Sequence, residues 1–201
     1  MSNWKIGKVW FCGLLTIFLL FPTFAGADDV TDSINEGLEH YKKGEHSSAV
    51  ESLNYAAQLI QQMKGEGLES FLPEPLSGWT AEPASSQAAA AAMMGGGVAA
   101  SRQYNKDSSS VEVQIITDSP MLQGMMMMFS NPMLATADGG KLEKIKGEKA
   151  IVKYDAANRD GEIQIVVANR FFIAISGNEV SKEDLKGYAQ GIDFKKLTTL
   201  P

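Results

Sequence analysis

The spacing of apolar residues changes once along this 201-residue chain, and that change constrains the fold class more than any other feature. Between residues 28 and 65, apolar residues recur every three or four positions, which is the period of a helix. From Val98 onward they alternate with polar residues, as Val111, Val113 and Ile115 do, which is the period of a half-buried strand. Helical and strand-forming segments separated in this way predict an α+β protein, in which helices cover an antiparallel sheet.

The helical segment 28–65 is predicted to be an αα-hairpin. Gly44 interrupts two periodic runs, the first of which carries Ile34, Leu38 and Tyr41. The second run has six apolar residues on one side: Ala49, Val50, Leu53, Ala56, Ala57 and Ile60.

The small and large residues of this hairpin follow a known spacing. Gly37, Gly44, Ala49, Leu53 and Ala56 stand where a tetratricopeptide unit has its small and large positions, so residues 33–63 resemble a single such unit. The small residues would let the two helices approach closely. Tetratricopeptide arrays need several repeats to bury their faces, and no second copy is found. We therefore expect the hairpin to dock on the rest of the protein, to pair with another copy, or to bind a partner; a generic packed hairpin is the alternative.

A linker at 66–77 is predicted to separate the hairpin from a second domain, 78–201. Pro73 and Pro75 in the linker oppose both helix and central strand, and Trp79 is predicted to anchor the core of the second domain. Within this domain, the low-complexity Ala/Gly segment 84–97 is predicted to be a flexible loop or a short helix.

The second domain is predicted to hold a series of antiparallel strands with helices between and after them. The strands are expected at 99–104, 111–116, 142–145, 149–154, 162–168 and 171–176, with a possible edge strand at 193–197. Helices are expected at 120–129 and from Ser181 onward, where Asp184 completes a capping pair. Ile116, Val166 and Phe172 are apolar on the opposite face of their strands, which predicts that both faces of the sheet are covered, with the hairpin as one candidate cover.

This order of elements resembles the PsbP/Mog1-like group over residues 76–197. The shared features are a proline-rich entry followed by Gly78-Trp79, an antiparallel series of strands and a closing helix. The resemblance implies a binding or assembly factor rather than an enzyme.

The N-terminus has the features of an export signal. Lys5 and Lys8 precede an apolar run at 9–21, and Ala25-Gly26-Ala27 is a small-residue pattern that predicts cleavage between Ala27 and Asp28. The apolar run is shorter than the roughly 20 residues of a membrane-spanning helix, although an uncleaved anchor is the alternative. We therefore predict a signal peptide at 1–27, no membrane span after its removal, and a periplasmic or secreted protein.

Composition excludes several classes of function. Cys12 is the only cysteine, so removal of the signal leaves no disulfide and no thiolate metal site. The signal also removes two lysines and no acidic residue, which takes the net charge from −6 to −8. An acidic surface repels nucleic acid and anionic lipid, so neither is a predicted partner.

Methionines crowd the segment predicted to be the first helix of the second domain. They and the neighbouring aromatic residue leave this helix almost no polar side: Met121, Met125, Met126, Met127, Met128, Phe129 and the nearby Met133. Three interpretations are open. The side chains could fill the core; Met121, Met125, Met126, Met128 and Phe129 could form a contact surface or ligand groove; or Met121, Met125 and Met128 could hold Cu(I) through their thioethers.

No catalytic constellation is found, and no cofactor is predicted. His40 and His46 lack metal-ligand spacing, and no serine occupies a nucleophile elbow. Five carboxylates at turns or strand ends could support hydrolysis but are typical turn residues: Asp118, Asp138, Asp155, Asp160 and Glu162. The sequence therefore predicts an exported, non-enzymatic binding or assembly protein whose partner is a protein or an apolar ligand, with metal handling by the methionines as the alternative.

Overall fold

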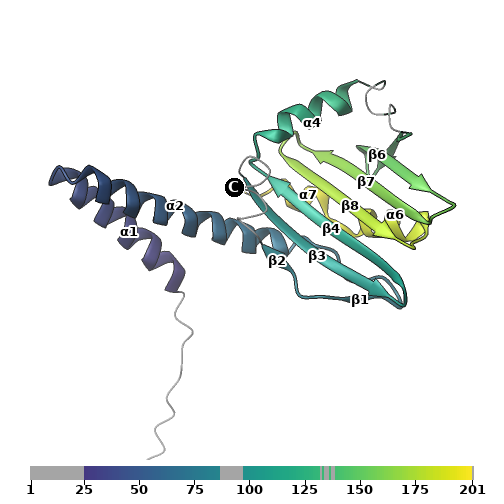
Figure 1. Ribbon diagram of the computed structural model, residues 1–201, viewed down its shortest axis with the longest axis horizontal. Coiled ribbons are helices and arrows are strands. Elements are labelled where there is room, and N and C mark those ends of the chain that lie inside the picture. Colours follow the sequence, from purple (N-terminus) through teal and green to yellow (C-terminus); the bar gives the residue numbers. More distant parts are fainter. Residues whose placement is uncertain (1–24, 87–96, 132, 134–135, 137–138, 201) are drawn as a thin grey trace, which may run out of the picture.

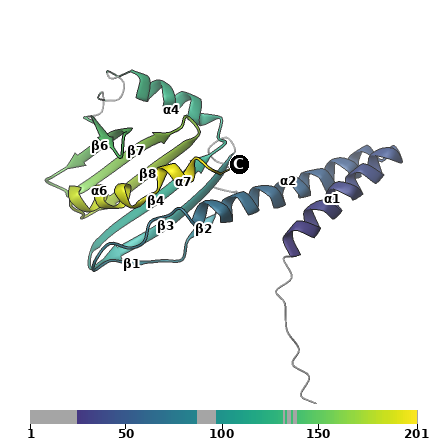
Figure 2. The same ribbon diagram turned by 180° about the vertical axis from the view of Figure 1, so that it is seen from behind.

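The protein is an α+β protein, as predicted: a helical hairpin followed by an antiparallel sheet with covering helices (Figure 1). The computed structural model describes residues 25–86, 97–131, 133, 136 and 139–200. In both views the hairpin extends away from the sheet, and only the last part of its second helix reaches the strands (Figures 1 and 2).

Helices α1 (Ala25–Lys42) and α2 (His46–Glu69) form the hairpin. Their contact is built from small side chains, because Ser33, Gly37, Ala49 and Ala56 are all buried. A Cβ atom added to Gly37 would lie 2.8 Å from Cγ of Leu53, so glycine is what allows this close approach. Small residues therefore set the helix spacing, as the sequence predicted.

Helix α2 is longer than predicted. It continues past residue 65 to Glu69, so the segment 66–77 is not wholly a linker. Gly65 packs against Ser86 and Val98, and Leu68 is fully buried in the main core. Gly65 and Gly67 have low helix propensity, but the tertiary contacts of this stretch outweigh it.

The eight strands of the described residues form one antiparallel sheet in the order β1-β3-β4-β8-β7-β6-β5, with β2 paired to β3. The strands are β1 (Thr80–Ala81), β2 (Ser85–Ser86), β3 (Val98–Lys106), β4 (Ser109–Thr117), β5 (Lys141–Ile145), β6 (Glu148–Asp155), β7 (Asp160–Val167) and β8 (Phe171–Asn178). All six long strands that the alternation predicted are present. Residues 87–96 of the low-complexity segment lie outside the described residues.

Helix α6 (Lys182–Gly191) covers the first face of the sheet. Ser181 caps it by accepting a hydrogen bond from the backbone N–H of Asp184 at 3.1 Å, as predicted. Leu185 and Tyr188 are fully buried, and the ring of Trp79 packs edge-on against Tyr188 at 5.6 Å between centroids. The predicted anchoring role of Trp79 is therefore confirmed.

The second face of the sheet is also covered, by helix α4 (Met121–Ser130) and not by the candidate hairpin. This helix places Leu122 and Phe129 in a second core cluster with residues of the sheet: Ala99, Ile116, Ile151 and Phe172. The hairpin does not lie there, because α2 meets the sheet beside β2 and β3 and its Leu68 joins the main core instead. The hairpin, which the sequence offered as one candidate for this cover, therefore does not cover this face.

The predicted edge strand at 193–197 is a short helix, α7 (Phe194–Leu197). The side chain of Asp193 accepts a hydrogen bond from the backbone N–H of Lys196 at 3.1 Å and so starts a helical turn. That turn brings Phe194 and Leu197, three residues apart, onto one buried side.

The predicted signal peptide lies almost wholly outside the described residues. Helix α1 begins at Ala25, so the predicted cleavage point between Ala27 and Asp28 falls in its first turn. Among the residues that the structure describes, no helix is both long enough and apolar enough to cross a membrane.

Candidate binding site at the base of the hairpin

The hairpin exposes most of the large apolar side chains that the described residues leave in contact with solvent. Eight of these eleven exposed side chains belong to it: Ile34, Leu38, Tyr41, Val50, Leu53, Tyr55, Ile60 and Met63. The other three, Met127, Met133 and Leu142, are scattered over the sheet domain. Single exposed apolar residues are ordinary, but a group of this size on two helices is not.

Six of these side chains lie on one side of the hairpin. Ile34, Leu38 and Tyr41 are spaced by four and three residues on α1 and so share one side of that helix. Val50, Leu53 and Ile60, spaced by three and seven residues, share one side of α2. We call these six residues the apolar hairpin face.

The opposite side of the hairpin is polar and acidic. Hollows there are lined by Glu36 and His40 of α1 with Glu51 of α2, and by Asp29 and Asp32 nearer the base. Two apolar side chains also reach them: Tyr55 lines both, and Val50, at the edge of the apolar hairpin face, lines the larger one. We call Asp29, Asp32, Glu36 and Glu51 the acidic hairpin face. The two open sides of the hairpin therefore differ sharply in charge.

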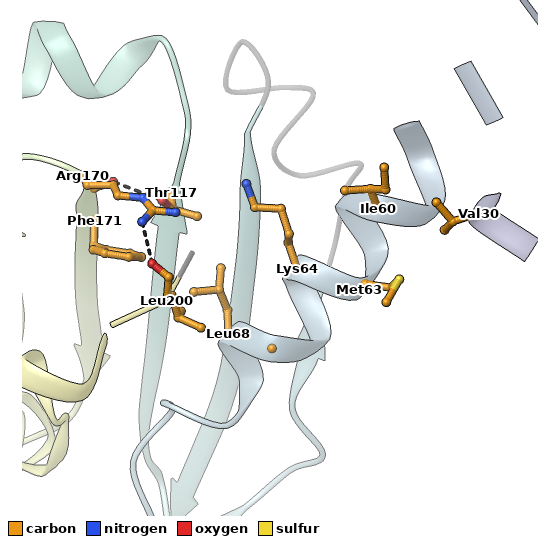
Figure 3. A pocket seen from close by; sticks show the side chains of 10 residues that line it. Val30, Ile60, Met63, Lys64, Leu68, Thr117, Arg170, Phe171 and Leu200 are labelled. Carbon is orange, nitrogen blue, oxygen red and sulfur yellow. Dashed lines mark hydrogen bonds between the residues drawn. The ribbon is translucent and has the colours of Figure 1, made fainter. Parts of the chain in front are cut away.

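A pocket of about 430 Å³ lies at the base of the hairpin, where α2 enters the domain (Figure 3). Its walls are almost entirely apolar and come from both helices, two strands and the C-terminal segment: Val30, Ile60, Met63, Lys64, Gly67, Leu68, Thr117, Arg170, Phe171 and Leu200. Ile60 belongs both to the pocket and to the apolar hairpin face, so the two surfaces are continuous. The volume falls in the range of sites that enclose small molecules or anchoring side chains.

Three charged residues hold the rim of this base pocket together. Lys64 of α2 donates a hydrogen bond to Asp118, which follows β4, and Nε of Arg170 in the β7–β8 loop lies 3.7 Å from the same carboxylate. Arg170 also donates from Nη1 to the backbone oxygen of Leu200 at 2.7 Å (Figure 3). These contacts join four segments that are remote in sequence.

The carboxylate of Asp118 is held in its charged form. Partial burial opposes ionisation, but the hydrogen bond and positive charge of Lys64 and the charge of Arg170 outweigh it and lower the pKa of Asp118. The three groups together carry one net positive charge. The pocket therefore combines apolar walls with a weakly cationic rim.

The methionine-rich helix α4 divides its side chains between packing and solvent. Phe129 is buried in the second core cluster, and Met125 packs half-buried against it. Met126 is half-buried and lines a shallow hollow beside β7, whereas Met127 is 69% exposed. The side chains of Met121 and Met128 lie outside the described part of the structure, so a contact surface or a copper site formed with them stays a prediction.

The remaining candidates from the sequence have structural contacts of their own. Nδ1 of His40 lies 2.5 Å from Oε2 of Glu45 at the hairpin turn. Asp155 accepts hydrogen bonds from two backbone N–H groups of its own turn, which confirms its turn-forming role. Asp160, at the start of β7, accepts one from the backbone N–H of Glu179, 19 residues away. Asp138 is outside the described residues, within which no group of three or more His, Cys, Asp or Glu side chains is placed to hold a metal ion.

The sequence analysis missed the base pocket because its residues converge only in three dimensions. Thr117, Arg170 and Leu200 come from segments more than 25 residues apart and share no motif. One local signal existed: the stripe on α2 continues through Ile60, Met63 and Leu68 beyond the predicted end of the hairpin.

Comparison of the chain with known protein families, curated proteins and solved structures finds no match.

Proposed function

We propose that this chain is an exported, non-enzymatic binding or assembly protein of the bacterial envelope, periplasmic or secreted, that binds a protein partner through the apolar hairpin face and the base pocket. One observation carries the proposal: large apolar side chains are concentrated on one side of a hairpin whose opposite side is acidic. The resemblances to a tetratricopeptide unit and to the PsbP/Mog1-like group support the same reading.

The packing of the hairpin explains why this surface fits a binding role better than a stabilising one. Small residues line the contact between α1 and α2, and of the six large residues Leu53 packs on Gly37 there while staying 46% exposed. Burying a large aliphatic side chain stabilises by roughly 1.5–3 kcal/mol relative to leaving it exposed. Six half-exposed side chains on one face therefore leave a large stabilisation that only a bound partner supplies.

Charge favours a protein partner over other macromolecules. The mature chain carries a net charge of −8 if the predicted signal is removed, which repels nucleic acid and anionic lipid surfaces. The apolar hairpin face avoids this charge, because helical spacing turns the carboxylates Asp29, Asp32 and Glu36 to the other side.

Site-specific photo-crosslinking tests the proposal. A photoreactive phenylalanine analogue replaces Leu38 on the apolar hairpin face. The matched control places it at Glu36, two residues away and on the opposite side of α1, in the acidic hairpin face. In cells that make the protein naturally, we expect discrete protein adducts from position 38 and none from position 36. Equal labelling at both positions, or no adduct at either, would overturn the proposed binding site.

Export is tested on the same material by the intact mass of the protein from the envelope fraction. Loss of residues 1–27 is expected, and a chain that keeps Met1 would contradict cleavage between Ala27 and Asp28.

A further inference from the structure

We infer that the base pocket binds a free fatty acid of medium chain length, whose hydrocarbon chain lies along the apolar walls and whose carboxylate lies at the rim beside Lys64 and Arg170. This inference rests on the proposed function in taking the base pocket as part of the binding site, and it adds the chemical class of a ligand. A fatty acid in the pocket leaves the apolar hairpin face available to the protein partner.

The walls of the base pocket suit a hydrocarbon chain. Met63 of α2 lies on one side and Phe171 of β8 on the other (Figure 3). The hydroxyl of Thr117, which also lines the pocket, donates a hydrogen bond to the backbone oxygen of Arg170 at 3.3 Å and so is already used within the protein. A sugar or a nucleotide would lose its hydrogen bonds with water on entering such walls. A hydrocarbon chain instead gains free energy from its burial.

The volume of the pocket fits a chain of medium length. A methylene group occupies about the same volume as a water molecule, roughly 30 Å³. The pocket of about 430 Å³ therefore holds about fourteen such groups. A fatty acid of roughly ten to fourteen carbon atoms would fill it, whereas a longer chain would extend into solvent.

The charge at the rim favours a carboxylate as the head group. The side chains of Lys64 and Arg170 are 38% and 33% exposed, and both interact with Asp118, so the three groups carry one net positive charge. A monocarboxylate brings this sum to zero. A phosphate dianion would make it negative, and an ammonium head group would add a second positive charge, so both are less favourable.

The guanidinium of Arg170 is already held beside the apolar walls. Its central carbon lies 5.1 Å from the centre of the Phe171 ring, and Nη1 donates to the backbone oxygen of Leu200 at 2.7 Å. Phe171 and Leu200 both line the pocket. A ligand carboxylate therefore meets a positioned cation, which lowers the cost of ordering the site.

Gly67 leaves open space on a side of α2 that lines the pocket. Among the described residues outside its own helix, no heavy atom lies within 4 Å of a Cβ added there. A Cβ added at Gly65 would by contrast lie 2.7 Å from Cβ of Ser86. Glycine weakens a helix relative to alanine, and no close contact requires it at position 67. Gly67 therefore keeps this wall of the pocket open.

The fatty acid is a free molecule and not a lipid within a bilayer. Asp29 and Asp32 of the acidic hairpin face lie near the base of the hairpin, and they oppose its approach to an anionic membrane surface. The position of a single carboxylate is governed instead by the charges nearest to it, which are those of Lys64 and Arg170.

Calorimetric titration tests the ligand class. The protein is purified without detergent from the envelope fraction, stripped of bound lipid on a hydrophobic resin and titrated with decanoate. We expect one molecule per chain with micromolar affinity. Hexanoate should bind about a hundredfold more weakly, because four fewer methylene groups are buried. Decan-1-ol, which has the same chain without the charge, should bind about tenfold more weakly. Equal binding of decanoate and decan-1-ol would overturn the carboxylate assignment, and no binding of decanoate would overturn the site.

Gly67→Leu tests the location of the site. The leucine side chain would occupy the open space, so we expect the affinity for decanoate to fall more than tenfold. The unfolding midpoint should stay the same or rise, because leucine has the higher helix propensity. Gly124→Leu, at a glycine of α4 that also has open space and lies outside the base pocket, is the matched control and should bind normally. Unchanged affinity in Gly67→Leu would overturn the location.

Lys64→Gln and Asp118→Asn have opposite expected effects and provide a second test that does not depend on Gly67→Leu. Lys64→Gln removes a cation from the rim and should weaken decanoate about tenfold while leaving decan-1-ol unchanged. Asp118→Asn removes the anion that competes for both cations and should strengthen decanoate severalfold. Weakening in both variants, or an equal change for decan-1-ol, would overturn the placement of the carboxylate at the rim.

Vesicles of phosphatidylglycerol distinguish a free fatty acid from a bilayer lipid. We expect no sedimentation of the protein with them, and sedimentation that Gly67→Leu abolishes would overturn the choice of a free molecule. Failure of this inference is also distinguishable from failure of the proposed function. Photo-adducts at position 38 without binding of decanoate would overturn the fatty-acid site alone. Binding of decanoate without photo-adducts would overturn the protein-binding face alone.

Discussion

Helix α6 and the hairpin each bury one side, but α6 buries large side chains whereas the hairpin buries small ones. Helix α6 directs the large residues Leu185 and Tyr188 inward. The sheet receives Leu185 over the glycines Gly161 and Gly177, and Tyr188 packs against Trp79 and Tyr104. The hairpin directs Gly37 and other small residues inward and leaves its large residues outside. The first arrangement stabilises a fold, whereas the second presents a surface.

The largest expected difference is between the same substitution made in each region. Leu185→Ala should lower the free energy of unfolding by about 3 kcal/mol, because Leu185 is fully buried and its removal leaves a cavity. Leu38→Ala should change it by less than about 0.5 kcal/mol, since Leu38 is half-exposed. Urea unfolding at low protein concentration measures both free energies. Similar losses of unfolding free energy in the two variants would contradict the conclusion that α6 stabilises the fold while the hairpin leaves its large residues exposed.

Replacing a glycine by alanine in each region tests the same difference between α6 and the hairpin. The expected change in unfolding free energy is smaller than for Leu185→Ala. A Cβ at position 161 would lie 2.6 Å from Cδ1 of Leu185 and 3.0 Å from the backbone oxygen of Lys153, neither of which can move freely. We expect Gly161→Ala to lower the unfolding free energy by about 2 kcal/mol, as overpacking does.

The hairpin counterpart is Gly37→Ala, where the new Cβ meets the half-exposed side chain of Leu53. Leu53 can swing toward solvent, and alanine has the higher helix propensity, so this variant should lose less than Gly161→Ala. Gly124→Ala in α4, with open space around it, serves as the control for propensity alone. A larger loss at position 37 than at position 161 would show that the hairpin contact is the more rigid one.

The smallest expected effect concerns the junction of the two regions, at Asp118. Its pKa is lowered in the folded protein, so its stabilising contribution is present above the unfolded pKa, near the ordinary value of 3.8, and is lost as the pH falls through the lowered folded pKa. Asp118→Asn should therefore flatten the acid limb of the stability–pH curve. The change should be below about 1 kcal/mol, because the carboxylate is partly exposed and screened by solvent.

Parallel curves for Asp118→Asn and the unmodified protein would show that the ion pairs with Lys64 and Arg170 contribute nothing to stability. Added salt should reduce the difference between the two proteins, since screening weakens exposed ion pairs.

Periodicity in the sequence was sufficient to predict the strands and helices that have one apolar side buried in the core. The alternation from Val111 to Ile115 predicted β4, and the spacing of Ser181, Asp184 and Leu185 predicted α6 with its cap. The apolar residues on the other side of the strands, Ile116 and Phe172, correctly predicted that both faces of the sheet are covered.

Features that depend on contacts between distant segments could not be predicted in this way. The length of α2 depends on Leu68 entering the main core, and the choice of α4 over the hairpin as the second cover depends on where the chain leaves the sheet. The five residues 193–197 fit a short strand as well as a helical turn. The hydrogen bond accepted by the side chain of Asp193 is what favours the helical turn. The base pocket likewise depends on the meeting of Lys64, Asp118 and Arg170, which no local pattern records.

The continuity of α2 ties the exposure of the apolar surface to the folding of the whole protein. Its 24 residues pair with α1 at one end and enter the main core at Leu68 at the other. A two-helix hairpin of this size is marginally stable by itself in water, so it draws its order from the domain that anchors it. A nascent or damaged chain whose sheet has not formed would therefore lack an ordered face to offer. If the hairpin binds a partner as proposed, the ability to bind would depend on the folding of the sheet domain.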